Sequence, residues 1–187
     1  MTCSYRKLGI LPQVFCLLYL LLSPAHAEDV PLLPQFQAFD APRDLGDLPF
    51  EDAKGKEKSL SDYRGHWVLL NLWATWCAPC RQEMPALDNL QNAFTDHQVA
   101  HLVVLPLSVD DAETRTHVFD FFHELNIKHL PILSDGGLNV LKRLHPRGLP
   151  TSWLINPNGK AVGEVEGFVQ WDSPEAGNLI QYYLQKK

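Results

Sequence analysis

The chain has 187 residues, of which 45% are hydrophobic and 20% charged, values typical of one globular domain. Its 22 acidic residues outnumber 16 basic ones, so the formal net charge is −6. We therefore expect no nucleic-acid binding, because a phosphate backbone attracts basic surfaces.

The N-terminus has the pattern of an export signal. Two basic residues precede an unbroken apolar stretch over 14–22, and Ala25 and Ala27 are the small residues that a signal peptidase accepts. We predict a signal peptide over 1–27 and hence a periplasmic or otherwise extracytoplasmic location. An uncleaved inner-membrane anchor is the alternative, although the apolar stretch is shorter than the roughly 20 residues that span a bilayer.

Removal of the signal leaves one pair of cysteines. Cys3 and Cys16 lie within it, so only Cys77 and Cys80 remain. A body of about 160 residues can bury a core without a disulfide cross-link. A disulfide between Cys77 and Cys80 closes so short a loop that it adds little stability. We therefore favour a redox-active disulfide over a structural one. A zinc half-site is the other alternative, but a zinc ribbon brings a second close-spaced pair, and we expect no metal and no cofactor.

The first elements are read from turns and apolar runs. Residues 28–45 carry three prolines and little periodicity, so we expect an extended lead-in without regular structure. Segments 48–51 and 58–60 flank a turn-forming run at 53–55, which predicts a hairpin at a sheet edge. Residues 67–73 are nearly all apolar, as in a central strand buried on both faces.

A helix is predicted directly after this strand, from Pro79 onward. Pro85 should bend this helix without ending it. Its apolar residues recur at helical spacing: Met84, Leu87, Leu90 and Phe94. Later elements are a strand at 102–109, a helix near 118–125, a short strand at 131–133, a short helix at 138–144, strands at 152–155 and 161–168 joined by a turn, and a helix over 173–184.

The cysteines thus lie at a strand-to-helix junction. A helix N-terminus stabilises the thiolate, which is the reactive form of cysteine. We expect Cys77 to attack a substrate disulfide, and Cys80, one turn further on, to resolve the mixed disulfide.

Two segments of the chain follow a known family pattern almost position by position. They are the run from Val68 to Asp88, which contains Trp-Ala-Thr-Trp-Cys-Ala-Pro-Cys, and the run from Gly148 to Ser152, with Asn156-Pro157-Asn158-Gly159 close behind. The chain resembles thioredoxin-fold proteins of the TlpA and ResA type over roughly 46–185, and the TlpA type most closely. This implies an α/β thioredoxin fold over 46–187: a central mixed sheet flanked by helices, with an N-terminal hairpin and a central strand/helix insertion.

The resemblance also implies a substrate surface. Pro150 is expected to be cis and to lie against the cysteines, which leaves the Leu149 backbone as an edge for an extended substrate. Trp76 either offers an apolar face beside Cys77 or belongs to the core. Thr151 either shapes the substrate groove or packs within its strand.

Glu83 is the third candidate catalytic residue. It lies three residues after Cys80 and hence on the same helical face, where spacing alone favours an exposed glutamate. Resemblance to ResA implies that it tunes the cysteines and moves protons. Asn71 stands where typical thioredoxins carry a buried aspartate, and because an amide does not titrate, Glu83 becomes the better acid–base candidate. We expect Asn71 itself to be a satisfied core amide.

We therefore predict a reductase of protein disulfides, because the Ala78-Pro79 dipeptide lacks the histidine of strong oxidants. The resemblance implies recharge by a membrane thiol-electron donor, and haem- or copper-binding apoproteins as substrates in cytochrome oxidase biogenesis or cytochrome c maturation. One alternative is a noncatalytic chaperone of such apoproteins. Another is a peroxiredoxin-like peroxidase, although Ala74 stands where that class places a threonine or serine.

Overall fold

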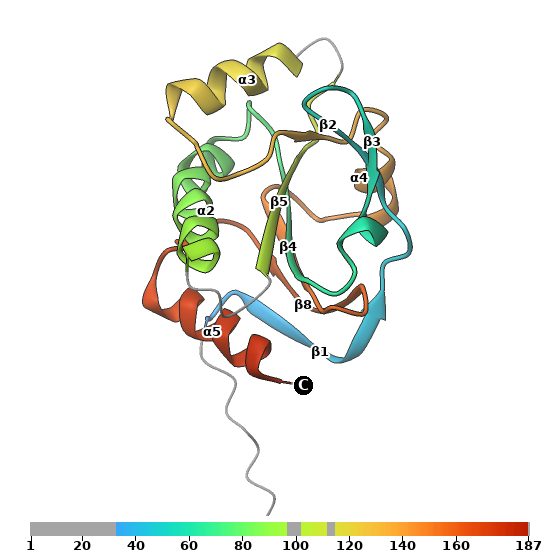
Figure 1. The fold of residues 1–187 in the computed structure, drawn as a ribbon, viewed down its shortest axis with the longest axis vertical. Helices are drawn as coiled ribbons and strands as arrows, with labels where there is room; N and C mark the ends of the chain where they lie inside the picture. Colours follow the sequence, from blue (N-terminus) through green and yellow to red (C-terminus); the bar gives the residue numbers. More distant parts are fainter. Residues whose placement is uncertain (1–32, 97–101, 112–114, 187) are drawn as a thin grey trace, which may run out of the picture. The chain divides into compact units, whose positions relative to one another are not determined.

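The computed structural model describes residues 33–96, 102–111 and 115–186, and the predicted signal lies outside them. The described part contains one eight-stranded mixed sheet with strand order β1-β8-β7-β4-β5-β6-β2-β3 (Figure 1). The strands are β1 Phe36–Asp44, β2 Pro49–Asp52, β3 Glu57–Ser59, β4 Trp67–Trp73, β5 Leu102–Ser108, β6 Leu133–Ser134, β7 Thr151–Ile155 and β8 Lys160–Glu166. The helices are η2 Leu60–Tyr63, α2 Ala78–Asp96, α3 Arg115–Glu124, α4 Asn139–Leu144 and α5 Pro174–Gln185.

Strand β4 is the centre of the sheet, as its sequence predicts. All seven of its residues are buried. It pairs in parallel with β5 and antiparallel with β7, without a break in register on either side. Successive side chains of a strand point to opposite faces, so an uninterrupted apolar run requires cover on both.

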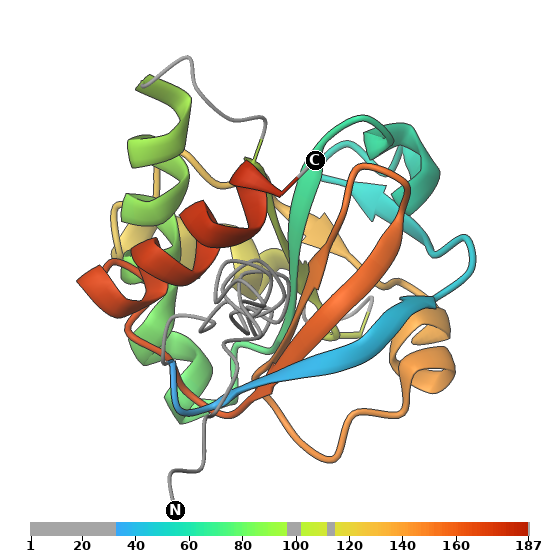
Figure 2. The same ribbon diagram turned by 90° about the horizontal axis from the view of Figure 1, so that it is seen from below.

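Helices provide this cover on both faces. Trp67 of β4 packs against Tyr183 of α5, and Trp73 packs against Phe121 of α3. Asn71, between them on the same face, contacts α2. Helices α2 and α5 lie on one side of the sheet and α4 on the other (Figure 2). None of the described helices is long and apolar enough to cross a membrane.

The lead-in corrects one expectation, because residues 36–44 form strand β1. This strand pairs with β8 at the edge of the sheet, with an irregularity between Ala38 and Arg43. Most of its side chains are exposed, so no apolar periodicity marks it in the sequence. Gly163 of β8 permits the pairing, since a Cβ there would lie 2.2 Å from Phe36 Cζ.

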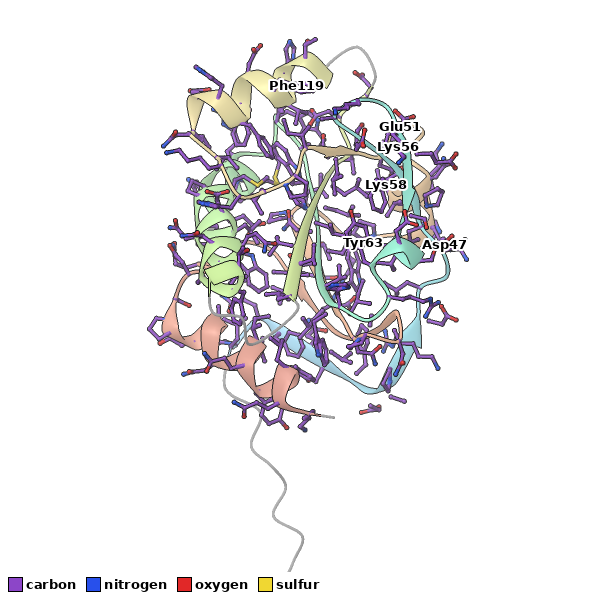
Figure 3. All side chains as sticks on the ribbon, viewed as in Figure 1. Asp47, Glu51, Lys56, Lys58, Tyr63 and Phe119 are labelled. Carbon is purple, nitrogen blue, oxygen red and sulfur yellow. A yellow bond between two sulfur atoms is a disulfide. The ribbon has the colours of Figure 1, made fainter. Side chains whose placement is uncertain are left out.

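The expected hairpin forms the opposite edge. Strands β2 and β3 pair across a turn in which Gly55 has a φ of 74° and donates its N–H to the Asp52 carbonyl. Charged side chains, Glu51, Lys56 and Lys58 among them, follow this hairpin (Figure 3). Charges along an edge oppose pairing with a second sheet.

The remaining elements follow their predictions with small changes at the ends. Helix α2 starts at Ala78 and continues through Pro85. The turn between β7 and β8 closes with Gly159 at a φ of 75°. Strand β8 ends at Glu166 because Gly167, with a φ of 86°, turns the chain away. Ser173 caps α5 by accepting the N–H of Ala176.

Candidate active site

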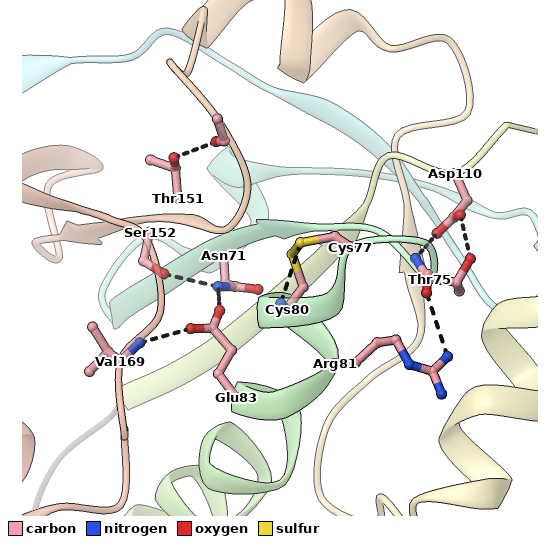
Figure 4. Close-up of a disulfide and its surroundings, with 11 residues drawn as sticks. Asn71, Thr75, Cys77, Cys80, Arg81, Glu83, Asp110, Thr151, Ser152 and Val169 are labelled. Carbon is pink, nitrogen blue, oxygen red and sulfur yellow. Dashed lines mark hydrogen bonds between the residues drawn. A yellow bond between two sulfur atoms is a disulfide. The ribbon is translucent and has the colours of Figure 1, made fainter.

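The two cysteines lie where β4 passes into α2. They form a disulfide, with 5.3 Å between their Cα atoms (Figure 4). Cys77 immediately precedes the helix, and Cys80 lies within its first turn. Cys77 is 5% exposed and Cys80 is fully buried. Of the two cysteines only Cys77 retains any exposure, which suits attack by Cys77 and resolution by Cys80.

A buried carboxylate holds the loop in front of Cys77. Asp110 follows β5 and accepts hydrogen bonds from the Thr75 backbone N–H, at 2.9 Å, and from the Thr75 hydroxyl, at 2.7 Å. The Ser108 hydroxyl donates to the same carboxylate at 2.6 Å. We did not predict Asp110 from the sequence. The sequence feature that could have indicated Asp110 is its position directly after β5. The carboxyl ends of the parallel strands β4 and β5 meet at one edge of the sheet, so a residue there lies near the cysteines.

Trp76 lies on the surface beside Cys77. It is 71% exposed, whereas Trp73 is fully buried in the core as predicted. A shallow groove of about 330 Å³ adjoins it, lined by Thr75, Trp76 and Arg81 together with four α3 residues, His117, Asp120, Phe121 and Glu124. Of the two alternatives for Trp76, the structure thus shows the exposed apolar face.

The segment before β7 lies at the same end of the sheet, because Thr151 pairs with Leu72 near the end of β4. The Leu149–Pro150 peptide bond is cis, as the resemblance implies. The Pro150 carbonyl accepts the Gly167 N–H at 2.9 Å, whereas no backbone hydrogen bond of Leu149 is found within the described part of the chain. Thr151 is buried and its hydroxyl donates to the Gly148 carbonyl at 2.8 Å. Its side chain therefore stabilises this segment.

Glu83 is buried, in contrast to the exposed position that its spacing favours. It is 1% exposed. Its Oε1 accepts from Asn71 Nδ2 at 2.7 Å, and its Oε2 accepts from the Val169 backbone N–H at 3.1 Å. Burial raises the pKa of Glu83 to about 7, against the lowering effect of these two bonds and of the Trp171 indole. The Trp171 indole nitrogen is buried and has no hydrogen-bond partner of regular geometry among the described residues. Glu83 can therefore gain or lose a proton near neutral pH.

Asn71 joins Glu83 to β7. Its Nδ2 donates to Glu83 and also to the Ser152 hydroxyl, at 3.0 Å. Its Oδ1 is buried and has no hydrogen-bond partner among the described residues. The prediction of a satisfied core amide is thus correct for the nitrogen and wrong for the oxygen.

Within the described residues, no group of three or more His, Cys, Asp or Glu side chains is arranged to hold a metal ion.

Comparisons with known proteins agree with this geometry. Residues 34–162 match the model of the AhpC/TSA family. The chain is 35% identical to the thiol-disulfide oxidoreductase ResA of Bacillus thuringiensis over 135 residues, which are 72% of this chain and 71% of ResA. The chain belongs to the AhpC/TSA family and is a ResA-type thiol-disulfide oxidoreductase.

Solved structures support the thioredoxin fold of this ResA-type oxidoreductase. A protein of Chlorobium tepidum described as a thiol:disulfide interchange protein DsbE superposes with a TM-score of 0.67 at 25% identity, over 79% of this chain and 99% of that one. The lipoprotein thioredoxin Etrx1 of Streptococcus pneumoniae superposes with a TM-score of 0.59 at 26% identity, over 76% of this chain and 100% of that one. The predicted α/β thioredoxin fold is confirmed.

Proposed function

We propose that this oxidoreductase reduces protein disulfides outside the cytoplasm. Its substrates are apoproteins that bind haem or copper through reduced cysteines, in cytochrome c maturation or cytochrome oxidase biogenesis. A thiol-electron donor in the membrane returns the pair to its dithiol form. The observation that carries the proposal is a shielded pair at the start of α2, Cys77 and Cys80, followed on that helix by the buried carboxyl of Glu83 with a pKa of about 7.

The reaction takes place in two exchanges. The Cys77 thiolate attacks one sulfur of the substrate disulfide, that S–S bond breaks, and the released substrate thiolate takes a proton. Cys80 then loses its proton and attacks the Cys77 sulfur. The mixed disulfide breaks, the second substrate sulfur leaves as a thiolate that takes up a proton, and the Cys77–Cys80 disulfide of this structure forms. Two electrons pass from the pair to the substrate, and Glu83 accepts the Cys80 proton.

The substrate surface surrounds Cys77. Exposed Trp76 and the groove beside it lie on one side, and the Leu149–Pro150 segment lies at the same end of the sheet. The Leu149 backbone, which has no hydrogen bond within the described part of the chain, supports docking of an extended substrate strand there. The direction of electron flow rests on the Ala78-Pro79 dipeptide, which offers no histidine to stabilise the Cys77 thiolate as strong oxidants do.

Capture of trapped partners tests the proposal. The Cys80→Ser protein should accumulate mixed disulfides with apoproteins that carry haem- or copper-binding cysteines, to be identified by mass spectrometry. The Cys77→Ser protein is the matched control and should trap none.

Three results would contradict the proposal. A reduction potential above about −150 mV would mark an oxidant instead. Full activity with both cysteines replaced by serine would mark a noncatalytic chaperone. Rapid turnover of peroxide would mark a peroxidase.

A further inference from the structure

The unpartnered oxygen of Asn71 is the starting point. Both hydrogens of its side-chain amide are used, one by Glu83 and one by the Ser152 hydroxyl. The carbonyl oxygen is buried in a side chain that is fully shielded from solvent, and no described residue donates to it. A buried acceptor without a donor is costly and is rare in folded proteins.

This oxygen is directed toward the cysteine pair. In Figure 4 the Asn71 side-chain oxygen points toward the start of α2, where Cys80 lies. Cys80 and Glu83 are three residues apart on α2 and so share one face of the helix. Asn71 is bonded to Glu83 on that face. The Asn71 oxygen thus lies on the side of the amide away from Ser152 and faces the start of α2, which carries Cys80.

Reduction creates the donor that this acceptor lacks. When a dithiol donor protein reduces the pair, the Cys77–Cys80 bond breaks, the donor's two thiols become a disulfide, and each cysteine takes up a proton. Cys80 is fully buried, so water does not reach its new S–H group in this fold. A thiol is a weak donor, and it still needs an acceptor when it is buried.

We propose that the Asn71 carbonyl oxygen accepts the hydrogen bond of the Cys80 thiol in the reduced enzyme. The amide is then satisfied in the dithiol state and unsatisfied in the disulfide state, so it stabilises the reduced form. It also favours the protonated form of Cys80, which leaves Cys77 as the thiolate that attacks. Asn71 acts through Cys80 and does not transfer a proton.

Asn71→Leu tests this role, because leucine has a similar volume and offers no acceptor. We expect the ratio of dithiol to disulfide at equilibrium to fall about fivefold to tenfold, which is a potential about 20–30 mV more negative at about 30 mV per tenfold. In the Cys77→Ser background, the acid dissociation constant of the Cys80 thiol should increase by a similar factor. It is measured from the absorbance of the thiolate. All proteins are full-length chains with Cys3 and Cys16 replaced by serine.

Glu83 is the titratable side chain that Asn71 also contacts, so the measurements are repeated with Glu83→Gln. Loss of the Asn71 donor raises the pKa of Glu83, because that bond lowers it. If Asn71 acted only through Glu83, the effect of Asn71→Leu would vanish in the Glu83→Gln background. We expect it to persist. Ser152→Ala, which removes a partner of the amide nitrogen and spares the oxygen, should leave the potential unchanged.

One measurement needs no change at Asn71. In the Cys77→Ser protein, Raman spectroscopy should show the Cys80 S–H stretching band at the lowered frequency of a hydrogen-bonded thiol. A band at the frequency of a free thiol would overturn the proposal. A decrease in Cys80 acidity on Asn71→Leu would also overturn it, since it would mean that the amide N–H, and not the carbonyl, faces the sulfur.

Discussion

At the scale of single residues, burial changes the chemistry that a motif predicts. Cys77, Cys80 and Glu83 are evenly spaced on the chain, and spacing alone gives Glu83 the character of an exposed carboxylate. In the fold its side chain is almost fully buried between Asn71 and Val169, and its pKa rises to about 7. A carboxyl that titrates near neutral pH suits proton transfer during thiol-disulfide exchange.

The kinetic consequence is a pH dependence carried by Glu83. Resolution of the mixed disulfide should become faster as pH rises through about 7, because ionised Glu83 accepts the Cys80 proton. Glu83→Gln should remove this inflection and slow the step about 100-fold at neutral pH. Stopped-flow release of substrate thiol from a preformed Cys77 mixed disulfide measures it. A Glu83→Gln protein that keeps the inflection would exclude this role.

The same carboxyl links stability to pH. The pKa of Glu83 rises from 4.5 to about 7 on folding, so between these values the folded state holds a proton that the unfolded state has lost. The contribution is fully present below about 4.5 and is lost as pH rises toward 7, to the extent of about 3 kcal/mol. Denaturant unfolding of the wild type and Glu83→Gln across this range should show the difference. The same change of unfolding free energy with pH in the two proteins would contradict it.

At the scale of elements, two aspartates attach segments near the site. Asp110 attaches the Thr75 turn to the end of β5. Asp88 of α2 is buried, and its Oδ1 accepts the backbone N–H groups of Lys128, His129 and Leu130. Its Oδ2 lies 3.1 Å from His129 Nδ1. Three successive N–H groups around one carboxylate form an anion-binding nest, which attaches the segment after α3 to the helix of the cysteines.

Asp88→Ala should destabilise the fold by about 2–3 kcal/mol, since it leaves backbone N–H groups unsatisfied. Burial opposes ionisation of Asp88, but the bonds from His129, Lys128 and Leu130 outweigh it and hold its pKa below the usual value of an aspartate. This contribution is present above the unfolded pKa and is lost as pH falls through the folded value.

The stability difference between the wild type and Asp88→Ala should therefore shrink in acid. Urea unfolding at neutral pH and at acid pH gives the comparison, with the exposed residue Asn92 changed to Ala as control. A difference that stays constant into acid would rule out the charged nest as its source.

At the scale of the whole described body, β1 closes the sheet on the side away from the hairpin. Its fit depends on Gly163, where a Cβ would meet Phe36 Cζ at 2.2 Å and the Gln37 backbone oxygen at 2.8 Å. A backbone atom cannot rotate away as a side chain can, so the strand itself must move.

Gly163→Val should therefore loosen β1 and spare the centre of the sheet. Hydrogen exchange should become faster in 36–44 and stay slow in β4 and β5, and the disulfide should remain redox-active. Val162→Ala, at the neighbouring position of β8, is the control, because it shortens a side chain and brings no new atom against β1. Unchanged protection of 36–44 in Gly163→Val would show that the strand is not held by this contact.

Much of the fold follows from local patterns. The apolar run of β4, the helical spacing after the cysteines and the turns at Gly55 and Gly159 each depend on neighbours in the chain, and each lies near its predicted position. The reactive pair is likewise local, because the chemistry of two cysteines separated by two residues needs only the helix that begins between them.

The rest was decided by tertiary contacts. Strand β1 has mostly exposed side chains and exists because β8 offers it an edge. Asp110 reaches Thr75 only because β5 lies beside β4. The raised pKa of Glu83 and the unpaired oxygen of Asn71 arise where α2 packs on the sheet. A sequence pattern reports which apolar residues are buried, but the partners of a buried polar group come from distant parts of the chain, and only the folded structure brings them together.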